Sequence, residues 1–219
     1  MRLIIAIWFS TILSGLSLPT DGQRYLKKRN TIEVGGGVNL SYFDVGGGSP
    51  GLTLAAGALF DLHPNWRIGP HVALHRTRGT DKGTPNEARG YSYRSNLFEI
   101  SFRGQYVFRF TPYPAKRWKR KLEPRVFGGL GIVQVQAVQN QPLSGQNSND
   151  GLSVAPLFSG GIGLAWHLER DLSLLLEAGS NLSTSDFLEG YTNLNNSSAR
   201  DMFHSILLKI IYRLPVNRF

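Results

Sequence analysis

Residues 96–110, NLFEISFRGQYVFRF, alternate between two kinds of side chain. Apolar residues take most even positions and polar or charged residues most odd ones, with Leu97 and Val107 as exceptions. A period of two sends alternate side chains to opposite faces of a β-strand, whereas a helix, at about 100° per residue, would mix them. The stretch exceeds the usual strand length of about five or six residues. A strand tilted by about 45° crosses a bilayer with about nine to eleven residues, so the pattern predicts a transmembrane strand.

Seven further segments carry a similar alternation, mostly in the same parity, and turn-forming residues separate them. In segment 125–139 the parity changes, because Leu130 and Ile132 fit one face while Val133 and Val135 fit the other. We expect a β-bulge near Ile132 to restore the alternation. The sequence thus predicts an all-β protein of eight antiparallel strands, at 31–42, 52–60, 66–76, 96–110, 125–139, 152–168, 172–180 and 202–214.

Alternation alone does not say which face meets solvent, because a soluble barrel would place its apolar face inside. The aromatic residues favour a membrane barrel. Six of them share the apolar parity and fall at one end of the predicted barrel, where an interfacial girdle would lie. These residues are Phe60, Trp66, Phe108, Phe110, Trp166 and Tyr212.

The opposite parity carries glycines and charges of both signs. We expect the charged side chains to neutralise one another in a narrow lumen, since burying unpaired charges is costly. Eight strands leave a packed interior and no open pore. The expected fold is an eight-stranded antiparallel transmembrane β-barrel of outer-membrane type, with a lumen charge network formed by Glu33, Glu99, Glu177, Arg67, Arg103 and Lys209.

The N-terminus predicts export. Arg2 precedes an apolar run that ends near Leu18, which is the layout of a secretory signal peptide. We expect cleavage before Gln23, with Thr20 and Gly22 at positions −3 and −1, so that 1–22 is the signal peptide and 23–219 the barrel domain. An uncleaved membrane anchor is the alternative, although the run is short for a spanning helix. The chain has no cysteine, and its net charge of +9 suggests acidic partners; export argues against nucleic acid.

Connection lengths suggest the orientation. Bacterial barrels have short periplasmic turns and longer outer loops, which places the short connections 61–65 and 169–171 in the periplasm. Segment 111–123 falls on the same side but is thirteen residues long and strongly basic. It could be a solvated turn, a docking surface for an acidic periplasmic protein, or a contact with anionic lipid headgroups. Its candidate partner-binding residues are Lys116, Arg117, Trp118, Lys119, Arg120 and Lys121.

The histidines are the residues most open to a chemical role. His71 and His75 lie four residues apart, about 13 Å on a strand, so those two side chains alone cannot share one metal. We interpret both as polar lumen residues. His204 and Ser205 are adjacent and would point to opposite faces of a strand. We therefore expect no catalytic residue, no metal and no cofactor, and a protein that is not an enzyme.

Three segments resemble the PorG-like outer-membrane proteins of Bacteroidota: 94–99 (RSNLFE), 110–113 (FTPY) and 124–131 (PRVFGGLG). The resemblance implies an eight-stranded barrel associated with the type IX secretion machinery, seated over a periplasmic ring of PorK/PorN-like proteins. It implies an anchor or assembly component for protein transport in the cell outer membrane, whose partners are outer-membrane lipid and the secretion-ring proteins. Two alternatives stay open, a lipid A modifying enzyme and a stand-alone structural or adhesive barrel.

Overall fold

The computed structural model describes residues 30–42, 47–83, 87–90, 92–108, 122–139, 153–184, 188 and 201–214. Within these ranges the chain forms eight β-strands and one short 3-10 helix, η2 (Glu87–Arg89). The strands are β1 (Asn30–Tyr42), β2 (Gly47–His63), β3 (Trp66–Thr80), β4 (Ser92–Val107), β5 (Leu122–Gln139), β6 (Ser153–His167), β7 (Leu172–Ser183) and β8 (Met202–Arg213).

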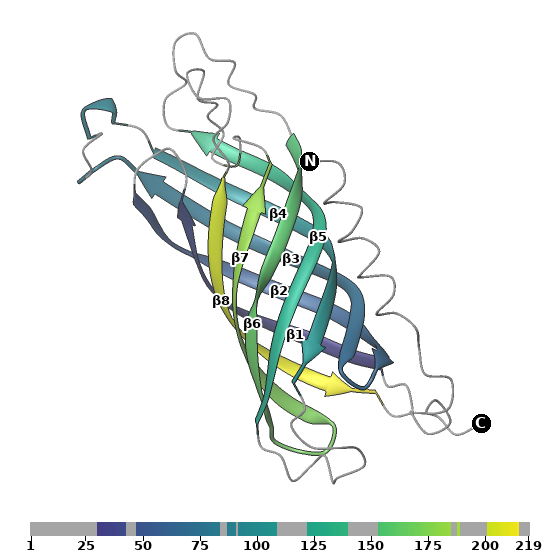
Figure 1. Ribbon diagram of the computed structural model, residues 1–219. Helices are drawn as coiled ribbons and strands as arrows, with labels where there is room; N and C mark the ends of the chain where they lie inside the picture. Colours follow the sequence, from purple (N-terminus) through teal and green to yellow (C-terminus); the bar gives the residue numbers. More distant parts are fainter. Residues whose placement is uncertain are drawn as a thin grey trace, which may run out of the picture.

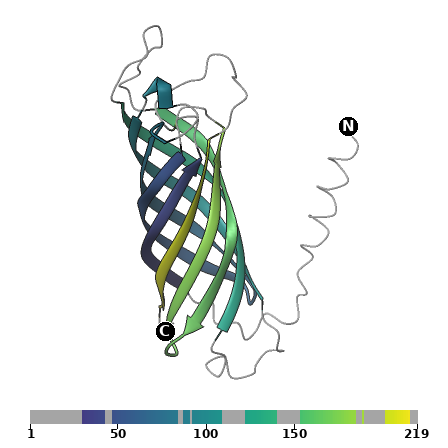
Figure 2. The same cartoon turned by 90° about the vertical axis from the view of Figure 1, so that its left-hand side faces the viewer.

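Each strand pairs antiparallel with its neighbour in the sequence, and β1 pairs with β8 to close the barrel. Figures 1 and 2 show the strands running obliquely around a cylinder. The predicted all-β class, the eight strands and their antiparallel closure are confirmed. No helix in the described part of the chain is long and apolar enough to span a membrane.

The two faces of the sheet separate by parity along the strands. Even-numbered residues point outward and odd-numbered residues point into the barrel, except at the two ends of β2, where register shifts pair Ser49 with Arg78 and His63 with Trp66. Outward Leu54 and Ile210 are 54% and 56% exposed, whereas inward Glu99 and Lys209 are 0% and 1% exposed. The outer face is therefore a wide apolar surface around a charged interior. This is the arrangement of a barrel whose outer face contacts lipid.

The prediction for β5 was wrong in one respect. Its register with β4 runs without interruption from Tyr93↔Gln139 to Val107↔Arg125, so the β-bulge expected near Ile132 is absent. Val133 and Val135 face the interior instead, where both are buried. Odd-numbered residues of β5 therefore point inward along the whole strand, and at Val133 and Val135 they line the interior with apolar side chains.

Strand boundaries also differ from the sequence prediction. β4 ends at Val107, and Phe110 lies outside the described residues. β5 begins at Leu122, so Glu123, expected in a loop, lies within the strand with its side chain buried. The expected signal peptide, 1–22, falls outside the described residues.

The barrel has two distinct ends. We call the end with the short connections β2–β3 (64–65) and β6–β7 (168–171) the turn end. The opposite end, which carries the connections β1–β2, β3–β4, β5–β6 and β7–β8, is the loop end. Helix η2 lies at the loop end, at the top of Figure 2.

Candidate functional site

The barrel interior holds the main concentration of charged side chains among the described residues. Five basic groups and five carboxylates there form ion pairs with one another. Equal numbers leave this set neutral, which limits the cost of burying it. The basic residues are Arg67, Arg103, Arg125, Lys209 and Arg213, and the carboxylates belong to Glu33, Asp61, Glu99, Glu123 and Glu177.

The turn-end cluster is centred on Glu123, the second residue of β5. Its Oε1 accepts a hydrogen bond from Arg125 Nη2 at 2.9 Å and lies 3.7 Å from Arg67 Nη2. Its Oε2 lies 3.4 Å from His167 Nε2 and 3.8 Å from Arg213 Nη2. One carboxylate thus contacts basic side chains from β3, β5, β6 and β8. These contacts link strands that are not neighbours in the sheet.

A second cluster, in the middle of the barrel, is centred on Glu99 of β4. Glu99 Oε1 accepts hydrogen bonds from Ser101 Oγ at 2.6 Å and from Arg103 Nη2 at 3.3 Å. Two histidines of β3 also meet this carboxylate. His71 Nδ1 lies 3.4 Å from Oε1 and His75 Nε2 lies 3.1 Å from Oε2.

Arg103 extends this second cluster across the barrel. Its Nη1 donates to Glu177 Oε1 of β7 at 3.1 Å, and Lys209 Nζ of β8 donates to the same oxygen at 2.7 Å. The Arg103 guanidinium also stacks on Phe127, 4.9 Å from the ring centroid. Gly161 makes room for this ring, because a Cβ there would come within 2.7 Å of it.

Toward the loop end the interior holds an apolar cluster together with uncharged polar side chains such as Ser41, Thr53 and Ser95. Leu97, Val133, Val135, Ala155, Leu157, Leu188 and Phe203 form one buried cluster. The ring of His75 meets that of Phe203 edge-on at 4.8 Å, where the polar and apolar layers join. Side chains therefore fill the barrel at each described level, as expected for eight strands.

The structure places all six predicted lumen charges on the inner face, but they divide into different groups. Arg103, Glu99, Glu177 and Lys209 lie together. Glu33 pairs instead with Arg125, and Arg67 pairs with Asp61 and Glu123. The sequence reasoning missed Asp61, Glu123, Arg125 and Arg213, although their odd numbers placed them on the inner face.

The histidines lie on the faces that parity predicted. His71 and His75 are buried in the lumen, where they share the Glu99 carboxylate. His204 points outward and Ser205 inward, so these neighbours do not meet. His204 Nδ1 instead contacts Ser180 Oγ of β7 at 2.7 Å. Within the described residues, no three His, Cys, Asp or Glu side chains are grouped to hold a metal ion.

Five of the six predicted girdle residues fall within the described residues. Phe60, Trp66, Phe108, Trp166 and Tyr212 are each 37–51% exposed near the turn end. Tyr106, which the prediction left out, joins two of these residues. Its ring centroid lies 5.0 Å from those of Trp66 and Phe108. The predicted partner-binding residues at 116–121 lie outside the described residues.

No family model matches the chain, and no curated protein matches its sequence. The PorG-like resemblance therefore stays a prediction. Among solved structures, Neisserial surface protein A is similar with a TM-score of 0.58 and 9% identity, over 84% of this chain and 97% of that one. Ail of Yersinia pestis, solved with the heparin analogue sucrose octasulfate, has a TM-score of 0.49 and 11% identity, over 86% and 100%.

A major outer membrane protein of Thermus thermophilus has a TM-score of 0.47 and 15% identity, over 84% of this chain and 99% of that one. At these identities the comparisons bear on the fold alone. The similarity to Neisserial surface protein A agrees with the closed eight-stranded register of this chain. The chain is an eight-stranded antiparallel transmembrane β-barrel of the outer-membrane type.

Proposed function

We propose that this barrel resides in the cell outer membrane and acts as an anchor and assembly component of a protein secretion machinery. The packed interior carries this proposal. Ion-paired side chains occupy the turn-end half, and an apolar cluster together with buried uncharged polar side chains occupies the loop-end half, so we expect no conduit for a solute through the described interior. A barrel of this kind acts through the surfaces it holds in the membrane.

We further propose that this machinery is type IX secretion and that the partners are PorK/PorN-like ring proteins in the periplasm. This proposal rests on the resemblance to PorG-like proteins and on the basic segment between β4 and β5. Those two strands meet this connection at the turn end, the end with the short connections typical of the periplasmic side. Six consecutive residues with five positive charges, 116–121, would suit an acidic protein face.

Replacement of Lys116, Arg117, Lys119, Arg120 and Lys121 by serine is expected to abolish co-purification of ring proteins with the tagged barrel in mild detergent. The reason is loss of charge complementarity with an acidic partner. The measurement is quantitative mass spectrometry of the purified complex. The matched control replaces a second basic segment, Lys27, Lys28 and Arg29, by serine and should retain the ring proteins. Unchanged recovery with the first variant would rule out 116–121 as the docking segment.

A second candidate function, lipid modification, is favoured by one contact. Ser180 and His204 are cross-strand partners on the outer face, and their Oγ and Nδ1 atoms lie 2.7 Å apart. A histidine at this distance can take the proton of a nucleophilic serine. Such a pair would also need a group to orient the histidine. We place this function second because it rests on one contact, whereas the anchor role rests on the interior as a whole.

Ser180→Ala separates the two functions. If the barrel is an anchor, a deletion strain complemented with the wild type or with this variant should yield lipid A of the same acyl pattern, measured by mass spectrometry. An enzyme that uses Ser180 would instead give two different acyl patterns, since the variant lacks the nucleophile. Equal amounts of folded barrel, judged by migration on gels with and without heating, provide the control.

A further inference from the structure

The outer face of the barrel carries a compact basic cluster. Among the outward-facing residues described on the eight strands, only three bear a full charge, and all three are arginines. Arg76 and Arg78 lie on β3 and Arg94 lies on β4. Each is exposed, in contrast to the buried arginines of the lumen. We name Arg76, Arg78 and Arg94 the rim arginines.

The sheet register brings the rim arginines together. Arg78 and Arg94 are direct cross-strand partners, and Arg76 is the next outward residue along β3. Like charges directly opposite each other on a sheet are destabilising unless something neutralises them. No described carboxylate forms an ion pair with any of the three. An anion bound beside these arginines would relieve the repulsion between them.

The position of the rim arginines along the barrel axis indicates where in the membrane such an anion would lie. Trp66, near the turn end, and Arg76 are ten residues apart on β3, which is about 33 Å along a strand. With a tilt of about 40°, the vertical separation is about 25 Å, the height of the apolar band of outer-membrane barrels. If Trp66 marks one membrane interface, Arg76 marks the other. The rim arginines then lie at the level of the lipid headgroups.

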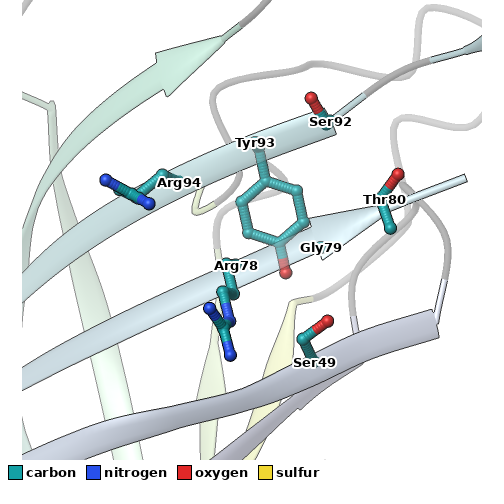
Figure 3. A pocket seen from close by; sticks show the side chains of 7 residues that line it. All are labelled: Ser49, Arg78, Gly79, Thr80, Ser92, Tyr93 and Arg94. Carbon is teal, nitrogen blue, oxygen red and sulfur yellow. The ribbon is translucent and has the colours of Figure 1, made fainter.

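The residues around them suit a lipid with a phosphorylated head. On the side toward the membrane, Leu74 and Phe98 are cross-strand partners that are 54% and 38% exposed, and Leu52 is the partner of Arg76 on β2. These side chains can cover an acyl chain. On the other side a pocket of about 490 Å³ is lined by Ser49, Arg78, Gly79, Thr80, Ser92, Tyr93 and Arg94 (Figure 3).

We propose that the rim arginines bind the phosphate of a phosphorylated glycolipid in the leaflet at the loop end, with its acyl chains on the apolar face below. Guanidinium groups bind phosphate oxygens in a bidentate manner, and the serine and threonine hydroxyls of the pocket add hydrogen-bonding groups for phosphate or sugar. Soluble phosphate would use the arginines but not the apolar surface beneath them. This site depends on the membrane orientation of the barrel and is independent of a secretion role.

The test uses the mature barrel, stripped of lipid in detergent and titrated with bisphosphorylated lipid A, while native mass spectrometry counts the bound lipid. R78Q/R94Q is expected to bind about thirty-fold more weakly than the wild type, because each basic residue at a membrane surface contributes roughly a factor of five toward anionic lipid. The control, R170Q, removes an exposed charge at the turn end, away from the pocket, and should bind like the wild type.

Two further probes on the wild type fix the ligand class. Dephosphorylated lipid A should bind at least tenfold more weakly than the bisphosphorylated form, and millimolar inorganic phosphate should not displace the lipid. Equal binding of the two lipid forms would overturn the proposal, as would wild-type affinity in R78Q/R94Q. Full displacement by inorganic phosphate would overturn the assignment to a lipid. These two probes decide the question even if the variant fails to fold.

Discussion

Glu123→Ala is expected to lower the free energy of unfolding by about 3–5 kcal/mol, the usual cost of removing one partner from a buried ion pair. The Glu123 carboxylate lies within 4 Å of Arg67, Arg125, Arg213 and His167. Alanine would leave buried positive charges facing one another at the turn end. The measurement is urea unfolding of the barrel in lipid vesicles, followed by tryptophan fluorescence.

Two variants show whether charge or packing causes the loss. Glu123→Gln keeps the volume and part of the hydrogen bonding, so it should fall between alanine and the wild type. Glu169→Ala removes an exposed carboxylate at the same end of the barrel and should change stability by less than about 0.5 kcal/mol. If Glu123→Ala unfolded at the wild-type urea concentration, the turn-end cluster would contribute nothing to stability.

The strands could be predicted because the signals that define them are local. A period of two and the turn residues between segments located eight strands, and parity located both faces. The prediction failed where it equated an apolar residue with an outward one. Val133 and Val135 face an apolar cluster in the interior near the loop end, so no bulge was needed. A fixed parity would have given the right answer in β5.

The pairing within the interior could not be predicted in the same way. Arg103 and Glu177 lie on β4 and β7, which are not neighbours in the sheet, so no strand register relates them. Their contact depends on the width of the barrel and the stagger of its strands. Glu123 was missed for a local reason. It follows a basic run and precedes Pro124, a sequence that indicates a loop although β5 has begun.

Leu208→Arg is expected to destabilise the barrel in lipid by about 2–4 kcal/mol, the cost of a basic residue on the lipid face near the bilayer midplane. Leu208 lies in the middle of β8, points outward and is 52% exposed. It neighbours Leu176, which is equally exposed on β7. An arginine there would enter hydrocarbon. The measurement is again urea unfolding in lipid vesicles.

Leu52→Arg is the matched control, because it makes the same substitution on the same face at a different depth. Leu52 is also 52% exposed, but it is the cross-strand partner of Arg76, at the level where the apolar belt ends. Its cost should be about 0–1 kcal/mol, as for basic residues near the interface. Equal stability of the two variants would mean that depth in the membrane has no effect. The outer face would then meet water, and both the transmembrane orientation and the lipid site at the rim arginines would be wrong.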